Sequence, residues 1–333
     1  MNSNKLKEIS IRINFPKKAG VLLLFWWISG FLISAEASKP LEIVTSWSIL
    51  EDVANNVGKE NIRVTSLAPR GIDLHDIKLT PGDQIRLRKS HLVIWLGLNL
   101  ENWLLPSLKN VPKEKQLEIG KHLSGLLPLY SSSDDKQKRQ QANDHLHEAH
   151  EHPGAFDPHI WHDVKMIIQV SEIIAHHLSI HDPKHAPGYK QNAQHYILQL
   201  KKLNGQIHEQ LSFIPKEHRL LVTGHDAFRY FGEAYDFQTL APRGLSTHDQ
   251  PSPWVMRHII STLREKKIRV LFIESGNTSS LLGRIGQEAD IEIKAELMSS
   301  NLNAFGETGD SYIGFMQKNI DTITEVFQSA LTQ

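Results

Sequence analysis

Short apolar runs rich in β-branched residues alternate, along the first part of the chain, with stretches whose apolar side chains recur every three or four positions. The short runs cover 41–45, 62–67 and 92–96, and the first helical stretch covers 48–57. Strands that alternate with helices indicate parallel pairing through right-handed crossovers. This part of the sequence therefore predicts an α/β lobe built on a parallel sheet.

The tetrapeptide Thr80-Pro81-Gly82-Asp83 has the features of a helix start. Thr80 can cap the helix, Pro81 suits its first turn, and Asp83 can complete a capping box. We expect a helix to begin here, between the second and third strands. A further helix is expected over 164–178.

The longest periodic stretch covers 187–212. Its apolar residues form one stripe on a helix of about 26 residues, or about 39 Å at 1.5 Å per residue. After it the alternation resumes. The residues of the stripe are Tyr189, Ala193, Tyr196, Ile197, Leu200, Leu203, Ile207 and Leu211. The later elements are strands expected at 220–223, 268–273 and 291–297 and helices at 253–266 and 311–331.

The whole pattern predicts an α/β fold of two (βα) lobes with parallel sheets, joined by one long helix. We expect the N-terminal lobe over 38–185, the linker helix over 186–214 and the C-terminal lobe over 215–333. A polar segment over 131–152 interrupts the first lobe, and its composition is that of a mobile insertion.

The N-terminal residues 1–37 have the composition of a secretory signal peptide. Lys17 and Lys18 precede an apolar run over 21–33, and Ala35-Glu36-Ala37 fits a cleavage site. The alternative is a transmembrane anchor, although the run is shorter than the roughly 20 residues that span a bilayer. The chain has no cysteine, so it lacks disulfides and the residue that would carry a lipoprotein's lipid. We therefore expect a free periplasmic protein.

Charge excludes some functions and histidine content favours another. Lys and Arg together number 37, as do Asp and Glu, so no basic excess indicates nucleic-acid binding. The 19 histidines indicate metal or pH chemistry. Those of the insertion are either an auxiliary metal-capturing loop or part of a solvated linker, and the sequence leaves both open; they are His145, His147, His150 and His152.

Four segments place a histidine or an aspartate where a strand or turn ends, which is where α/β proteins usually bind ligands. The four residues are His75, His159, His225 and Asp310. Imidazole and carboxylate suit zinc and similar divalent ions. Spacing alone cannot join the four, and the sequence has no H-E-x-x-H motif of a zinc protease.

A family resemblance supplies the connection. The segments Gly71-x-Asp73-x-His75, Asp157-Pro158-His159-x-Trp161, Thr223-Gly224-His225-Asp226 and Gly309-Asp310-Ser311-Tyr312 occur in this order. Together they resemble the motifs of the metal-specific solute-binding proteins of ABC importers, the ZnuA/TroA-like family. The resemblance extends over about residues 41–330. Leu74 departs from it where proline is common, and His162 and Val164 depart around the second motif.

The resemblance implies a rigid linker helix and a metal site in the cleft between the lobes. His75 and His159 would come from the N-terminal lobe, and His225 and Asp310 from the C-terminal lobe. It further implies a monomeric periplasmic protein that carries zinc, or alternatively manganese, to a membrane permease and catalyses nothing. Glu274, at the end of a strand, is expected to orient a ligand histidine.

Two other functions remain open at this stage. A secreted zinc hydrolase could use the same three histidines and aspartate, with Asp226 or Glu274 as general base. A metal buffer or adhesin would bind the ion without a transporter. His248 is a further candidate to approach the cleft. The remaining histidines are interpreted as surface or packing residues: His91, His122, His176, His177, His181, His185, His195, His208, His218 and His258.

Overall fold

A four-stranded parallel sheet organises the first half of the chain in the computed structural model. Its strands run in the order β2-β1-β3-β4. Their bounds are β1 Leu41–Thr45, β2 Ile62–Ser66, β3 Leu92–Trp95 and β4 Gln116–Glu118. The structure describes residues 39–74, 77–129, 156–245, 247, 251–266, 268, 270–275, 280–291 and 293–331. The predicted signal peptide, the 131–152 insertion and His248 lie outside these residues.

Helices cross between these strands as the apolar pattern predicts. The helix α1 (Ser48–Gly58) buries one face, and α2 (Pro81–Lys89) begins at the predicted capping box. There the Thr80 hydroxyl accepts from the Asp83 N–H at 3.2 Å, and the Asp83 carboxylate accepts from the Thr80 N–H at 2.8 Å. The short α3 (Leu105–Leu108) follows, and α5 (Val164–His181) closes this half.

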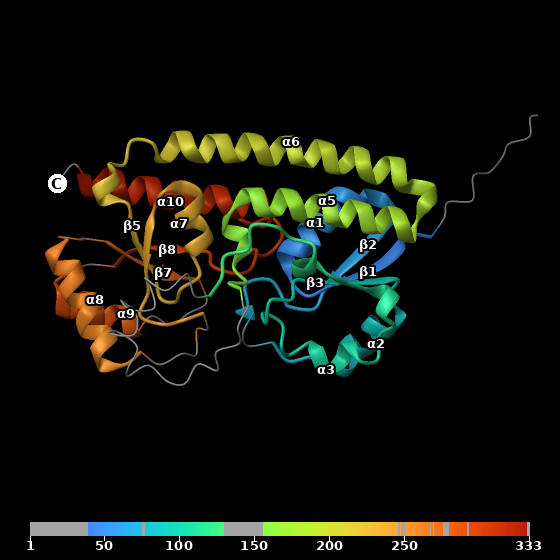
Figure 1. Ribbon diagram of the computed structural model, residues 1–333, viewed down its shortest axis with the longest axis horizontal. Helices are drawn as coiled ribbons and strands as arrows, with labels where there is room; N and C mark the ends of the chain where they lie inside the picture. The colour runs from blue at the N-terminus through green and yellow to red at the C-terminus, as the bar shows by residue number, and fades with distance from the viewer. Residues whose placement is uncertain are drawn as a thin grey trace, which may run out of the picture. The chain divides into compact units, whose positions relative to one another are not determined.

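The long helix α6 spans Ala186–Leu211, and its buried residues are those of the predicted stripe. It packs along α5, as Figure 1 shows. It also contacts α1 and α10. Asn192 donates to the Val57 carbonyl at 3.0 Å, and the Tyr196 hydroxyl donates to Asp52 at 3.2 Å. The helix is therefore attached along its length and not only at its ends.

The second half contains two parallel strand pairs, β5–β6 and β7–β8. The strands are β5 Leu220–Val222, β6 Gln238–Leu240, β7 Leu271–Glu274 and β8 Ile293–Leu297. The helices are α7 Arg229–Tyr235, α8 Pro253–Glu265, α9 Ser280–Ala289 and α10 Tyr312–Leu331. The strand expected from 268 was placed too early, since β7 starts at Leu271. The described residues also form short 3-10 turns: Lys59–Asn61, Lys113–Lys115, Ile119–Lys121, Ile160–His162, Pro183–His185 and Lys216–His218.

One apolar core extends through both halves. Its largest cluster contains Ile43 of β1, Leu50 of α1, Leu200 of α6, Phe272 of β7 and Phe315 of α10. Two smaller clusters lie beneath α8–α9 and beneath α2–α3. Lys39–Gln333 forms one compact unit, so the boundaries proposed for the two lobes stay a prediction. Within the described part of the chain, no helix combines the length and the apolar character needed to cross a membrane.

Candidate metal site

His159 lies in the loop that leads into the 3-10 turn Ile160–His162 and is almost completely buried. The Asp157 carboxylate accepts from its backbone N–H at 2.9 Å and contacts its Nδ1 at 2.8 Å. Because this carboxylate holds the proton on Nδ1, the opposite nitrogen, Nε2, keeps the lone pair that a metal requires. The Arg229 guanidinium lies 3.5 Å from the second oxygen of Asp157 and offsets its buried charge.

His225 follows β5 and is held in the same way by a more distant residue. Glu274, at the end of β7, accepts from the backbone N–H groups of Gly224 at 2.8 Å and His225 at 3.0 Å. Its other oxygen contacts His225 Nδ1. The contact predicted between Glu274 and a candidate ligand histidine is therefore present. Burial disfavours the imidazolium, but the Glu274 charge and hydrogen bond outweigh it and raise the pKa of His225.

Gly224 matters because its backbone approaches this carboxylate closely. A Cβ at position 224 would lie 3.3 Å from Glu274 Oε1, tighter than an ordinary contact. A side chain here would press on the carboxylate that orients His225. The glycine before the histidine thus permits the Glu274 contact.

The two imidazoles face each other across the two halves of the chain. Their ring centroids are 5.3 Å apart and their planes are inclined by 67°. A tetrahedral ion bound at about 2.0–2.1 Å by two imidazoles, each with its centroid about 1.1 Å behind the nitrogen, would hold the centroids about 5.2 Å apart. The observed separation fits two ligands of one ion. Both side chains are buried, which suits a site that excludes water.

The structure does not bring the other two candidate ligands together with this pair of imidazoles. His75 lies outside the described residues. Asp73 precedes it and contributes to the raised pKa of His225, so this loop is within electrostatic reach of that imidazole. The Asp310 carboxylate accepts from the Gly306 N–H at 2.8 Å. Among the described residues, no three histidine, aspartate or glutamate side chains are close enough to hold an ion.

Trp161 and His162, beside His159, connect the first half of the chain to the loop that contains Ser299. The Trp161 Nε1 atom donates to the Ser299 carbonyl at 2.7 Å, and His162 Nε2 contacts the same oxygen at 3.0 Å. Burial, followed by the nearby His159, lowers the pKa of His162 well below its usual value. His162 is therefore a neutral donor, and the nitrogen used for Ser299 is not available to a metal.

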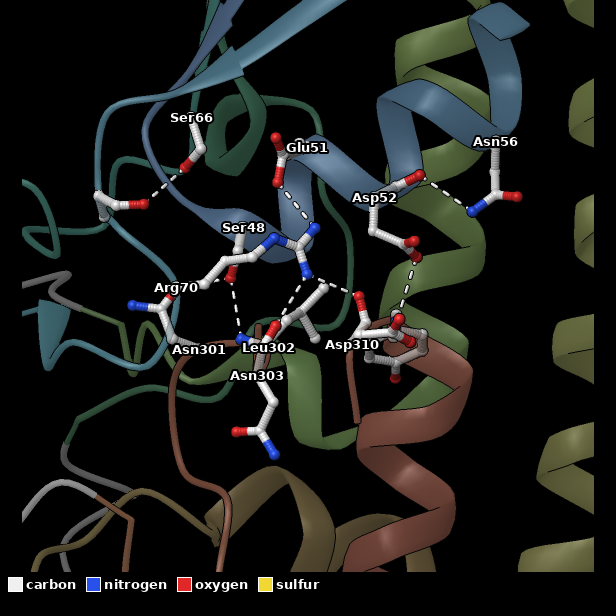
Figure 2. Close-up of polar contacts among 12 residues, drawn as sticks. Ser48, Glu51, Asp52, Asn56, Ser66, Arg70, Asn301, Leu302, Asn303 and Asp310 are labelled. Carbon is white, nitrogen blue, oxygen red and sulfur yellow. Dashed lines mark hydrogen bonds and ion pairs between the residues drawn. The ribbon is translucent and has the colours of Figure 1, made fainter. Parts of the chain in front are cut away.

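Sequence reasoning missed two contributors to this site. Asp157 was noted in its motif without a role, although an aspartate two residues before another backbone N–H is a common local hydrogen-bond pattern. Arg70 lies outside the four motifs. Its guanidinium donates to the Asp310 carbonyl at 2.6 Å, as Figure 2 shows. This contact joins residues 240 positions apart, so no local signal could reveal it.

Comparison with known proteins identifies the family of the chain. The chain belongs to the family described as "Zinc-uptake complex component A periplasmic", whose sequence model matches residues 43–326. It is therefore a metal-binding solute-binding protein of an ABC importer, whose partners are the ion that it carries and a membrane permease. The fold and the resemblance predicted from the sequence are confirmed.

The names of individual relatives refer to different metals. The chain is 30% identical over 300 residues to the manganese-binding lipoprotein MntA of Halalkalibacterium halodurans, which covers 90% of this chain and 91% of that protein. It is also 30% identical to the iron-binding protein YfeA of Yersinia pestis, over 88% of each chain. The solved periplasmic zinc-binding protein TroA from Treponema pallidum shares the fold, with a TM-score of 0.75, 24% identity and coverage of 86% of this chain and 99% of that one.

Proposed function

We propose that this protein captures zinc in the periplasm with His75, His159, His225 and Asp310 and delivers it to its permease as a monomer. The observation that supports this most directly is the pair of buried imidazoles 5.3 Å apart. Each has a carboxylate on Nδ1, so both are prepared to bind metal through Nε2. Metal-binding histidines usually have this arrangement.

Donor chemistry favours zinc over manganese. Three imidazoles and one carboxylate match the nitrogen-rich sets of zinc, whereas manganese prefers carboxylate, carbonyl and water oxygens. Relatives are named for manganese, iron and zinc, so the family alone does not select the metal. We therefore assign zinc on the ligand set and keep manganese as the second candidate.

The function that we propose includes no catalysis. A hydrolytic zinc site needs a general base close to an open coordination position. Both oxygens of Glu274, one candidate base, are engaged by His225 and the preceding backbone. The absence of cysteine from the sequence supports a periplasmic protein without a lipid, unlike relatives named as lipoproteins.

Metal analysis and native mass spectrometry of protein purified from its own periplasm test the identity of the ion. We expect one tightly held zinc per monomer; one manganese instead would overturn the choice of metal. Competition with a chelating dye tests the ligands. His225→Ala should weaken binding strongly, whereas His218→Ala, an exposed histidine in the turn Lys216–His218, should not. Unchanged affinity in His225→Ala would remove that residue from the site.

The 131–152 insertion needs a separate test. Deleting it should leave the tight site intact and abolish any weaker zinc binding that depends on its histidines. Loss of the tight site on deletion would show that the insertion supplies a primary ligand.

A further inference from the structure

Arg70 connects the first half of the chain to the loop that carries Asp310. Its guanidinium donates to the main-chain oxygens of Asn303 at 3.2 Å and Asp310 at 2.6 Å, and to the Glu51 carboxylate at 2.8 Å. The Arg70 and Glu51 side chains are each only 12% exposed. Hydrogen bonds from a charged donor in such a setting are stronger than those between neutral groups. Figure 2 shows the Arg70 side chain contacting Glu51 and the main chain of Asn303 and Asp310.

An aromatic ring covers the same guanidinium. The Phe305 ring centroid lies 3.8 Å from the Arg70 Cζ, within the range of a cation–π contact. The phenylalanine is itself 73% exposed, so its contact with Arg70 is not explained by burial in a core. Arginine presents a planar, rigid fork that can stack and donate at once, which lysine cannot do.

Residues of α1 hold the two ends of the segment 302–312. The Ser48 hydroxyl accepts from the Leu302 N–H at 2.9 Å. Asp52 accepts from the Tyr312 N–H at 3.1 Å, so α1 fixes the first residue of α10. Between these ends Arg70 contacts the main chain of Asp310 itself, and the Asp310 N–H donates to Glu307 within the loop at 3.1 Å.

We propose that Arg70 is a positioning residue of the metal site. It fixes the Asp310 main chain against α1, so that the carboxylate is presented to the ion at a small entropic cost. This inference rests on the proposed function, in which Asp310 is a ligand. Glu51 has a supporting role because its charge holds the guanidinium in place. Removing the Arg70 guanidinium should make the Asp310 segment more mobile and shorten the time for which the ion stays bound.

A double-mutant cycle tests the inference. Zinc affinity is measured by dye competition for the wild type, Arg70→Ala, Asp310→Ala and the double variant. We expect Arg70→Ala to weaken binding about tenfold in the wild type, at the lower end of the 10–100-fold typical of residues that orient metal ligands. In the Asp310→Ala background it should change affinity by less than about twofold, because coupled residues are not additive.

Two further measurements separate positioning from a general loss of structure. The visible spectrum of the Co²⁺-loaded protein should change in Arg70→Ala in the same direction as in Asp310→Ala. Arg63→Ala is the matched control, since Arg63 forms an exposed pair with Glu42 at 2.9 Å, and it should leave affinity and spectrum unchanged. If Arg70→Ala does not fold, Glu51→Gln replaces it in the cycle, with a smaller expected loss.

The outcomes distinguish this inference from the ligand assignment. An equal loss in both backgrounds, or no loss in either, overturns the positioning role and leaves Asp310 as a ligand if Asp310→Ala alone weakens binding. No effect of Asp310→Ala removes the ligand itself, and the role of Arg70 falls with it. A tenfold loss confined to the background with Asp310 intact supports the inference.

Discussion

Replacing Glu274 with glutamine should disable His225 as a ligand without removing it. In the wild type one Glu274 oxygen accepts two backbone N–H groups and the other holds His225 Nδ1. Glutamine has a single acceptor oxygen. If that oxygen keeps the backbone contacts, its NH₂ group faces Nδ1 and drives the imidazole proton onto Nε2. The nitrogen that would bind the metal then carries a hydrogen.

The expected effect is a 10–100-fold loss of zinc affinity, which is the usual range for such a change and corresponds to about 1.4–2.7 kcal/mol. Dye competition at pH 7.5 measures it. Glu101→Gln is a matched control, because Glu101 is equally buried and also accepts two main-chain N–H groups, from Leu96 and Gly97. No histidine contact is involved there, so zinc affinity should not change.

Apo-protein melting curves show whether either variant is simply unfolded. Wild-type affinity in a folded Glu274→Gln protein would refute the reasoning, since His225 would then bind without its carboxylate or not bind at all. An equal loss in Glu101→Gln would refute it as well, because the effect would then follow from any buried charge.

Three further predictions concern pH and stability. Burial raises the pKa of Glu101 from an ordinary 4.5 to about 7. The free energy of unfolding, measured by urea titration, should therefore fall by about 3 kcal/mol as the pH rises from 4.5 through 7. Glu101→Gln should remove this pH dependence, and an unchanged profile in that variant would contradict the raised pKa of Glu101. Because the pKa of His225 is raised, protons should compete with zinc at pH values above those at which an ordinary histidine is protonated. The zinc-induced rise in melting temperature should therefore be smaller at pH 5.5 than at pH 7.5, and equal rises would count against histidine ligands. Thr80→Ala removes the capping hydroxyl of α2 and should lower the free energy of unfolding by about 1 kcal/mol, whereas Thr80→Ser should retain most of it; equal losses in both would exclude the hydroxyl as the cause.

The elements that the sequence predicts well are those with strong local periodicity. The stripe of α6 and the capping box at Thr80 appear as expected, because helix registry and caps depend on residues a few positions apart. The short elements β4, β6, α3, α7 and α9 were not predicted. The strands β4 and β6 are three residues long and lack the continuous apolar run that marks the equally short β5. Their pairing depends on neighbours distant in the chain.

The metal site likewise contains some features that the sequence predicts and others that it does not. Histidines at strand ends were recognisable, but their grouping was supplied by the family resemblance and not by spacing. The contact between Glu274 and His225 spans 49 residues and that between Arg70 and Asp310 spans 240. Such pairs are created by the topology, and a single sequence contains no periodic signal for them. The grouping of all four proposed ligands stays a prediction.

One apolar cluster includes residues of β1, α1, α6, β7 and α10. This cluster affects how the protein unfolds and how fast it is degraded. A core shared by both halves favours one cooperative unfolding transition, because neither half can open without exposing side chains of the other. An ion that binds only the folded chain then protects distant amides from hydrogen exchange together with those beside the site. Proteases that cleave transiently opened chains would attack the empty carrier faster than the loaded one, so the supply of metal would set how long each copy survives.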